Sequence, residues 1–316
     1  MWKTYKMKNF PWIDEKISSI DLNNLSHALI IEGQEGVGKN QICHHLINEL
    51  LSEKNSKNLI KNNSHPDLFC INDETLISYF QREDKNKLKA KTKKIPVGFI
   101  REAIDFIMLK SGLSKNKILF IDRAENLTIS SQNALLKTLE EPPQNTYIII
   151  QSNRFKCLNQ TIYSRCQLIH LNNLSQEKLH NWAKEILKDE SDNTIIPNYM
   201  TPKKVSQHIE VGSFEELKIL KSSLNKLFYP LDALNIDVSK GEEINKIIDL
   251  NLDFIEKLNY IIDFALTLLK NDKTKIHPVR LSDFIEQLAA FRENLLDINT
   301  LNQRYALNHL LLKIPN

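Results

Sequence analysis

Two short apolar runs separated by one helix constrain the fold of this chain most. Ile118–Ile121 is predicted to be a buried strand ending in Asp122, and Tyr147–Ile150 is predicted to be a second strand. Between them Thr128 is a candidate N-cap for a helix that Pro142-Pro143 end. Runs that are apolar throughout are typical of strands covered on both faces. The segment therefore predicts a parallel α/β sheet joined by right-handed crossovers, with Asp122 at the carboxyl edge where such sheets bind ligands.

The alternation of strands and helices extends toward the N-terminus and stops after Leu171. Ala28–Ile31 and Leu68–Ile71 are further apolar runs with the length of strands. Residues 100–108 have the apolar spacing of an amphipathic helix, which Gly112 is predicted to end. After Leu171 the apolar positions recur only with the period of helices. We therefore expect an α/β part followed by an all-α part.

A glycine-rich stretch follows the first predicted strand and precedes a predicted helix. It fits the phosphate-binding pattern G-x-x-x-x-G-K-[ST] at every place but the last, where an asparagine replaces the hydroxyl that binds Mg²⁺. Such glycines let backbone N–H groups surround phosphates, and the lysine balances the charge of the outer phosphates. The loop is expected to hold nucleotide weakly, to hold it without productive metal, or to survive only as a turn. The residues are Gly33, Gly36, Gly38, Lys39 and Asn40.

Composition sets the class of protein and its surroundings. At 316 residues and 41% hydrophobic content, the chain has room for two or three domains. A formal net charge of +3 defines no charged tail, and the Lys-rich segment 81–94 is expected to be a solvated loop because no aromatic residue interleaves its lysines. No run of eighteen apolar residues and no signal sequence are present, so a cytoplasmic protein without a membrane partner is expected. The four cysteines form no C-x-x-C pair and are expected to be free thiols.

Five short motifs give the whole chain a resemblance to a known family. They are His27-Ala28-Leu29, His65-Pro66-Asp67, Ile95-Pro96-Val97 with Arg101, the run from Asn133 to Pro143, and Thr161-Ile162-Tyr163-Ser164-Arg165-Cys166. With these motifs the chain resembles the AAA+ clamp-loader subunits of bacterial DNA polymerase III. The run Asn-Ala-Leu-Leu-Lys-Thr-Leu-Glu-Glu-Pro-Pro is highly specific when Ser-Arg-Cys follows at this distance.

The resemblance implies a domain plan and a set of partners. It implies an AAA+ P-loop α/β domain over residues 1–171, a small helical lid over 172–212 and an all-α collar over 213–316. The collar helix is predicted to open with a capping box, Ser213-Phe214-Glu215-Glu216. The implied partners are the delta and gamma/tau loader subunits, and through them the sliding clamp and primed DNA. Many relatives carry a four-cysteine zinc cluster before His65, but residues 51–64 contain no cysteine, so we expect no zinc.

Three departures from the motor subunits of that family argue against ATP turnover by this chain. Hydrolysis needs Mg²⁺ on the phosphates, a residue that orients water and positive charge on the transition state. Asn40 replaces the hydroxyl, and Arg123 follows Asp122 where the motors have a glutamate. Glu215 stands where they have a phosphate-sensing arginine. The motors carry an acidic pair at the end of this strand, and Asp122 is then the one member of that pair that remains.

Arg165 is the residue on which the expected function rests. Only eight of the 42 basic residues are arginines, and this one belongs to the most specific motif. The leading hypothesis is a structural subunit of the loader that supplies Arg165 in trans to a nucleotide held by its neighbour, while it needs no cofactor itself and belongs to the polymerase holoenzyme. The alternative role for Arg165 is a surface salt bridge. The alternative function is a self-sufficient AAA+ ATPase motor; a polymerase or nuclease is disfavoured because no paired metal-binding carboxylates are found.

Overall fold

The computed structural model describes residues 10–53, 55–83, 94–171, 174–187, 196–229, 236–270, 276–293 and 300–314. The chain divides into two compact units. Unit 1 runs up to Ser175 and includes Thr201–Lys203, and unit 2 consists of Gln176–Met200 and the residues from Lys204 on. The predicted Lys-rich loop falls largely in 84–93, outside the described residues.

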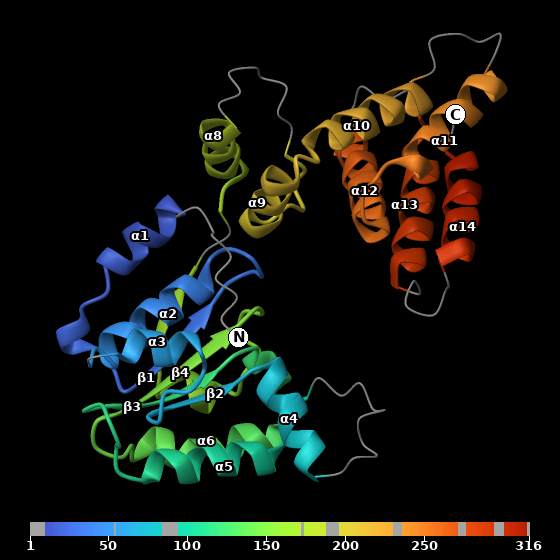
Figure 1. Cartoon of the computed structure of the whole chain (residues 1–316). Coiled ribbons are helices and arrows are strands. Elements are labelled where there is room, and N and C mark those ends of the chain that lie inside the picture. The colour runs from blue at the N-terminus through green and yellow to red at the C-terminus, as the bar shows by residue number, and fades with distance from the viewer. Residues whose placement is uncertain are drawn as a thin grey trace. The chain divides into compact units, whose positions relative to one another are not determined.

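Unit 1 is built on a five-stranded parallel sheet (Figure 1). The strand order is β2-β3-β4-β1-β5, so the strands nearest in sequence are not all neighbours and each connection crosses over the sheet. The two central pairs are in register at Leu29↔Ile149 and Leu119↔Ile148. The strands are β1 (Ala28–Glu32), β2 (Leu68–Ile71), β3 (Lys117–Ile121), β4 (Thr146–Ser152) and β5 (Gln167–His170). The parallel α/β sheet predicted from the apolar runs is confirmed.

Helices cover both faces of this sheet. In Figure 1, α5 and α6 lie under the sheet and α1, α2 and α3 lie over it. The lower helices are α5 (Val97–Met108) and α6 (Ile129–Glu140), and the upper helices are α1 (Pro11–Ser18), α2 (Lys39–Leu50) and α3 (Ser56–Lys61). Unit 1 also contains α4 (Asp73–Glu83) and α7 (Gln160–Tyr163). Single 3-10 turns lie at Leu22–Asn24 and Ala124–Asn126.

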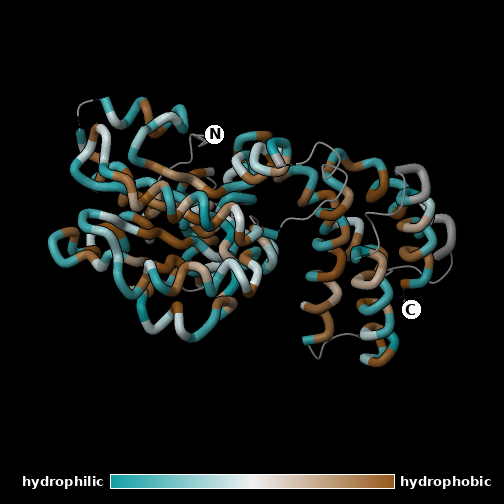
Figure 2. The backbone as a smooth tube through the Cα atoms, turned by 90° about the horizontal axis from the view of Figure 1, so that it is seen from below, coloured by the Kyte–Doolittle hydropathy of each residue, from teal (hydrophilic) through white to brown (hydrophobic). Residues whose placement is uncertain are grey.

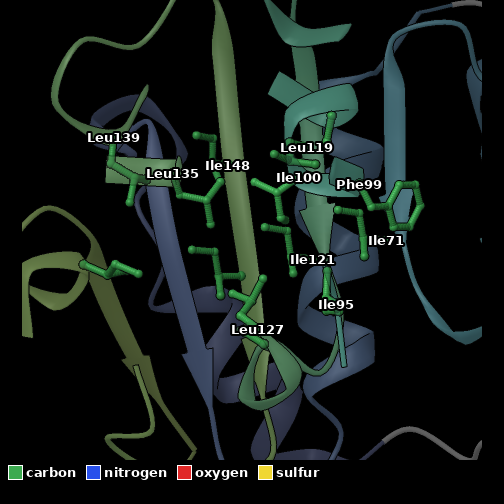
Figure 3. Packing of buried hydrophobic residues seen from close by; sticks show 14 of the residues in the cluster. Ile71, Ile95, Phe99, Ile100, Leu119, Ile121, Leu127, Leu135, Leu139 and Ile148 are labelled. Atoms are coloured by element: carbon green, nitrogen blue, oxygen red, sulfur yellow. The ribbon is translucent and has the colours of Figure 1, made fainter. Parts of the chain in front are cut away.

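The core of unit 1 lies between β3, β4 and the helices α5 and α6. Leu119, Ile121 and Ile148 point from the strands toward Ile100 and Leu135, all of them fully buried (Figure 3). Figure 2 shows the same layering as hydrophobic strands inside helices of mixed hydropathy. Strands β1 and β3 are buried along their whole length, as expected for central parallel strands, whereas the edge strand β5 is exposed at three of its four residues.

Two local predictions about helix ends have different outcomes. Thr128 caps α6 as predicted, because its Oγ1 accepts a hydrogen bond from the backbone N–H of Ser131 at 3.1 Å. The predicted end of α5 is wrong. The helix ends at Met108, four residues before Gly112, and the Gly112 N–H bonds to the side chain of Asp67 and not to a carbonyl of the helix. Gly112 therefore acts in a loop, described below.

All regular elements among the described residues of unit 2 are helices. The predicted leucine stripe of α10 is confirmed, since Leu217, Leu220, Leu224 and Leu227 are all buried. Helix α10 packs on α11, α11 packs on α14, and α12 packs on α13. The helices are α8 (Gln176–Leu187), α9 (Pro202–Val211), α10 (Phe214–Phe228), α11 (Ile236–Asp249), α12 (Phe254–Lys270), α13 (Pro278–Glu293) and α14 (Thr300–Leu312). The division of these helices between a lid and a collar stays a prediction.

The predicted capping box at Ser213 is wrong. Helix α10 begins at Phe214, but Ser213 makes no side-chain cap. Its Oγ lies 2.6 Å from Nδ1 of His208, whose Nε2 contacts Glu256 of α12 at 2.5 Å. His208 of the preceding helix thus binds the hydroxyl that the sequence pattern assigned to the start of α10, and Glu256 holds His208 in place. None of the helices in the described part of the chain is long and apolar enough to cross a membrane.

Candidate functional site

The glycine-rich loop joins β1 to α2 and has the backbone that only glycine adopts easily. Gly36 has φ 86° and Gly38 has φ 106°, both in the left-handed region. Packing also requires glycine at both positions. A Cβ on Gly36 would lie 2.5 Å from the Thr201 hydroxyl, and a Cβ on Gly38 would lie 2.7 Å from Ile13 Cγ1. The loop is therefore shaped as the sequence predicts and is packed against α1 on one side and against residues 201–203 on another.

Lys39 is buried and bonded to the loop itself. Its Nζ donates hydrogen bonds to the carbonyl oxygens of Gly33 and Gln34, each at 2.6 Å. Burial lowers the pKa of Lys39 to about 8, although the carboxylates of Glu125 and Asp122 act in the opposite direction. A phosphate that used this lysine must compete with two carbonyl groups that already hold it. The loop fits a phosphate-binding turn, and its lysine is committed to the turn.

The residues around the loop fit a metal ion poorly. Asn40 is exposed on the first turn of α2. Asp122 is half-buried, and its Oδ1 already accepts hydrogen bonds from Gln151 Nε2 at 2.7 Å and from the Arg123 N–H at 2.8 Å. Burial raises the pKa of Asp122, which weakens it further as an ionised ligand. Asn40 and Asp122 therefore do not form the hydroxyl and carboxylate pair that holds Mg²⁺ in active P-loop enzymes.

Arg123 is the residue predicted to replace the carboxylate that orients water in ATP-hydrolysing relatives. Its guanidinium forms an ion pair with Asp73 of α4, with 3.3 Å between NH1 and Oδ2. Glu215 lies in unit 2 on the exposed first turn of α10, where it pairs with Lys218 at 2.8 Å. Arg123 and Glu215 are each held by an ion pair. The motor subunits are expected to have a negative side chain at the first position and a positive one at the second, and this chain has the opposite charge at both.

The cysteines are free thiols. Cys43 and Cys70 are buried, in α2 and β2 respectively, and Cys157 and Cys166 are half-buried. Burial raises the pKa of Cys70 and of Cys166 to about 12, so neither is a ready thiolate ligand. No group of three or more His, Cys, Asp or Glu side chains in the described ranges is arranged to hold a metal ion. The expected lack of zinc stays a prediction.

Arg165 lies between α7 and β5, apart from the glycine-rich loop. Its NH1 donates to the Thr161 carbonyl at 2.8 Å and its NH2 pairs with Glu140 of α6 at 2.5 Å, while 32% of its side chain remains exposed. Strands β1 and β5 are parallel neighbours with Glu32 opposite His170. The glycine-rich loop follows the carboxyl end of β1, whereas Arg165 precedes the amino end of β5, so the two lie at opposite edges of the sheet. The structure therefore brings the loop, Lys39 and Asp122 together and leaves Arg165 apart from them.

A buried carboxylate that sequence reasoning missed connects these two places. Glu32, the last residue of β1, is fully buried, and its Oε1 accepts hydrogen bonds from the Tyr163 hydroxyl and the Lys156 N–H. Its Oε2 lies 3.6 Å from His170 Nδ1 and has no hydrogen-bond partner among the described residues. Tyr163 comes two residues before Arg165. Because the partners are 131 residues apart in sequence, no local pattern could have predicted the contact.

The Glu32 contact gives a stability prediction. Replacing Tyr163 with phenylalanine is expected to lower the free energy of unfolding by about 1–3 kcal/mol, because it leaves a buried carboxylate with one fewer donor. The measurement is urea denaturation of the full chain. Tyr147→Phe, a half-buried tyrosine of β4, is the control and should cost much less. Equal losses for the two variants would show that the Glu32 contact contributes nothing special.

The fold and the loop together define a class of protein. A parallel sheet of order β2-β3-β4-β1-β5, with a glycine-rich loop and lysine between the inner strand β1 and the helix α2, is an AAA+ P-loop domain, here followed by a helical unit. The fold class predicted from sequence is confirmed. A solved structure of a DNA polymerase III, gamma subunit-related protein from Thermotoga maritima MSB8 has the same fold, with a TM-score of 0.51, 16% identity, and coverage of 96% of this chain and 97% of that one.

The family is defined more narrowly by sequence. Residues 12–175 match the model of the family described as "DNA polymerase III, delta subunit", and the chain belongs to that family. It is 28% identical to DNA polymerase III subunit delta' of Haemophilus influenzae over 188 residues, which are 55% of this chain and 53% of that protein. It is 31% identical to DNA polymerase III subunit gamma of Buchnera aphidicola over 201 residues, which are 61% and 52% of the two chains. The chain thus spans about half the length of these relatives, and the predicted resemblance to the clamp-loader subunits of bacterial DNA polymerase III, delta prime among them, is confirmed.

Proposed function

We propose that this chain is a subunit of a DNA polymerase III clamp loader that supports the ring and donates Arg165 to a nucleotide held by its neighbour, while turning over little or no ATP itself. Its relatives are subunits of DNA polymerase III, which supports membership in such a complex. The proposed partners are the delta and gamma/tau subunits and, through the assembled loader, the sliding clamp and primed DNA.

The place of Arg165 carries the proposal. The guanidinium lies before the edge strand β5, partly exposed, and away from the glycine-rich loop of its own chain. An arginine so placed has no phosphate to serve within its own domain, but an edge strand is where a second subunit has access. A planar guanidinium binds phosphate oxygens through two parallel hydrogen bonds, which suits it to charge that builds up on a transferring phosphoryl group.

The contacts of Arg165 also define what the guanidinium must do to act. Both terminal nitrogens are engaged, NH1 with the Thr161 carbonyl and NH2 with Glu140. Ion pairs of this exposure contribute about 0–1 kcal/mol, so a neighbour's phosphate can replace Glu140 at small cost. The Thr161 contact comes from the same segment and keeps the side chain directed outward during the exchange.

The isolated protein is expected to release no phosphate from ATP at a measurable steady rate. The reason is chemical: Lys39 is held by the loop carbonyls, Asn40 offers no hydroxyl, and Arg123 is paired with Asp73 in place of a water-orienting carboxylate. The measurement is phosphate release by a homogeneous preparation, with Lys39→Ala as the control. Steady turnover that Lys39→Ala abolishes would favour the alternative, a self-sufficient ATPase motor, for which the retained glycines and lysine are the supporting observation.

The helices of unit 2 are expected to be the main attachment to the ring, because an all-α segment this large and apolar suits a subunit contact. A fragment ending near Gly212 keeps every segment of unit 1 and removes α10 to α14. It should fold, by circular dichroism, yet fail to co-elute with the other loader subunits in size-exclusion chromatography. Assembly of the fragment as tightly as the full chain would show that the helical unit is not the attachment.

A further inference from the structure

A loop far from the glycine-rich loop is held in place by a buried carboxylate. Asp67 is fully buried, and its side chain accepts hydrogen bonds from three consecutive backbone N–H groups: those of Gly112 at 2.6 Å, Leu113 at 2.8 Å and Ser114 at 2.7 Å. Three convergent donors on one carboxylate fix the backbone of all three residues. This loop, residues 109–116, connects α5 to β3.

A buried cation holds the first half of the same loop. Lys117 is only 5% exposed, and its Nζ donates to the carbonyl oxygens of Leu109 and Lys110, both at 3.2 Å. The ammonium also lies 4.2 Å from the centre of the Phe106 ring. Asp67 thus fixes loop N–H groups and Lys117 fixes loop carbonyl groups, so that five backbone hydrogen bonds determine one short connection.

His65 completes the network and explains the motif His65-Pro66-Asp67. Its Nδ1 accepts a hydrogen bond from the Asp67 N–H at 3.1 Å, and its Nε2 faces the hydroxyls of Ser56 at 3.1 Å and Ser114 at 3.4 Å. His65 is buried, and burial lowers the pKa of its imidazole. The motif therefore serves the 109–116 loop rather than the glycine-rich loop.

The side chains that this rigid loop presents to water are apolar. Leu109 is 66% exposed, Leu113 is 46% exposed, and Met108, the last residue of α5, is 55% exposed. Lys110 and Lys115, which stand beside them in sequence, are exposed as well. Side chains this exposed bury little apolar area and so do little for the stability of unit 1. Asp67, Lys117 and His65 thus fix a loop whose outer apolar side chains are largely uncovered by the residues that the structure describes.

We propose that Met108, Leu109 and Leu113, together with Lys110 and Lys115, form a docking surface for another protein of the assembly, one whose contacting face carries acidic side chains around apolar ones. A loop whose backbone is fixed before binding loses less conformational entropy when it docks, which favours affinity from a small surface. The two lysines require a complementary negative potential. The loop leads into the first residue of β3, whereas the glycine-rich loop follows the last residue of β1, so the surface is separate from that site.

Two other occupants fit less well. Single-stranded nucleic acid needs aromatic side chains on which bases stack, and residues 108–116 contain none, while three exposed apolar side chains offer nothing to phosphates. A second copy of this chain would meet the same patch in a two-fold interface, which brings the lysines of both copies, four positive charges, into one small contact. Like charges so opposed disfavour self-association through this loop.

The inference rests on the proposed membership in a clamp loader, and the test separates the two. The full chain carrying a photo-crosslinking benzoylphenylalanine in place of Leu109 is assembled with purified delta, gamma/tau and sliding clamp of the same organism, and cross-linked peptides are identified by mass spectrometry. We expect a cross-link to one protein partner, at a site with acidic and apolar side chains. The same label in place of Ile129, 71% exposed at the start of α6, is the control.

The partner that cross-links then serves as the probe for affinity. The double variant Leu109→Glu with Leu113→Glu should raise the dissociation constant at least tenfold, and Lys110→Glu with Lys115→Glu should do the same with a weaker dependence on salt. Ile129→Glu should leave the dissociation constant unchanged, and all variants should keep the melting temperature of the full chain.

The remaining outcomes overturn the proposal in distinguishable ways. A chain that enters the assembly but gives no cross-link above the Ile129 control, or binds within twofold when both leucines are replaced, would refute the docking surface and leave the loader proposal standing. Cross-links to DNA or to a second copy of the chain would replace the proposed partner. A chain that enters no assembly at all would refute the proposed function, and the docking surface with it.

Discussion

Replacing Arg165 with alanine is expected to lower the clamp- and DNA-stimulated ATPase of the assembled loader by at least an order of magnitude at the affected site. An arginine supplied in trans stabilises transition-state charge and contributes about 10³ to 10⁵ in rate in well-studied systems of this type. The chain itself should stay folded and assembled, because the variant loses one partly exposed ion pair, which contributes about 0–1 kcal/mol.

Two matched variants separate the arginine's proposed action from its ion pair. Glu140→Ala breaks the same contact and keeps the guanidinium, so the ATPase of its loader should stay within severalfold of wild type. Arg82→Ala removes another surface arginine, one that pairs with Glu102 at 2.9 Å, and should change neither assembly nor rate. If Glu140→Ala reduced turnover as much as Arg165→Ala, the ion pair would be what matters, and Arg165 would have a structural role alone.

Lysine at position 165 tests the geometry of the proposed contact. A compact ammonium supplies the charge but cannot reproduce the planar fork that binds two phosphate oxygens at once. We therefore expect partial rescue, with a rate between those of arginine and alanine. The measurement is ATP turnover by reconstituted complexes that differ only at this position. Equal rates for arginine, lysine and alanine would leave the chain as a scaffold.

The parts of the fold that sequence predicted are those fixed by local pattern. An apolar run such as Ile118–Ile121 can be assigned to a strand buried on both faces without knowing which elements pack against it, and this assignment is confirmed. The glycine-rich loop was also predictable, because its backbone demands glycine at 36 and 38 independently of the rest of the chain. The cap at Thr128 needs only the three residues that follow it.

The predictions that failed are those in which a group outside the short sequence motif bonds to the atom that the motif assigned to a helix end. Ser213 has the sequence of a helix cap, but His208 binds its hydroxyl, and His208 is itself held by Glu256. Gly112 has the sequence of a helix stop, but its N–H bonds to Asp67, 45 residues earlier. The spacing of residues in a motif does not show such contacts. A motif can therefore identify Ser213 or Gly112 as a polar group near a helix end, but it cannot identify the residue to which that group bonds.

The same reason explains what sequence missed at the candidate site. The acidic remnant Asp122 was predicted, yet its hydrogen bond from Gln151 spans 29 residues and was not. The sequence indicated that Lys39 faces phosphates, whereas the structure bonds it to the carbonyls of Gly33 and Gln34. These contacts determine whether the loop can bind nucleotide, and they depend on the folded arrangement of β1, β3 and β4.

Asp67 is expected to be the most costly single position to change in unit 1. Asp67→Ala should lower the free energy of unfolding by about 3–5 kcal/mol, because it leaves three backbone N–H groups without an acceptor and removes the negative charge that favours the protonated form of the buried Lys117. Asp67→Asn should cost less than alanine, since its amide oxygen still accepts, although its NH₂ group faces donors. Asp105→Ala, an exposed acid on the preceding helix, should change stability by no more than about 0.5 kcal/mol.

The acid dependence of stability gives an independent check on the same contact. Burial by itself raises the pKa of Asp67, but the N–H groups of Ser114, Gly112 and Leu113 together outweigh burial and lower that pKa below its ordinary value of 3.8. A carboxyl whose pKa is lower in the folded state stabilises the fold fully above the unfolded value and loses that contribution as the pH falls below it. Stability of the wild type should therefore decline in acid below about pH 4 more steeply than stability of Asp67→Asn, which has no proton to gain there.

Burial of His65 should cause a second decline in the free energy of unfolding, at a higher pH than the decline caused by Asp67. Burial lowers the pKa of the His65 imidazole below its ordinary value of 6.5, so the unfolded chain binds a proton that the folded chain refuses. That contribution is complete above pH 6.5 and falls as the pH drops below it in both proteins, more deeply in Asp67→Asn because the Asp67 charge no longer raises the pKa of His65. Urea denaturation of both proteins from neutral to acid pH distinguishes the two groups, because only the lower window should disappear with Asp67→Asn. If the two curves stayed parallel down to the lowest pH, the Asp67 carboxylate would not be what holds the 109–116 loop.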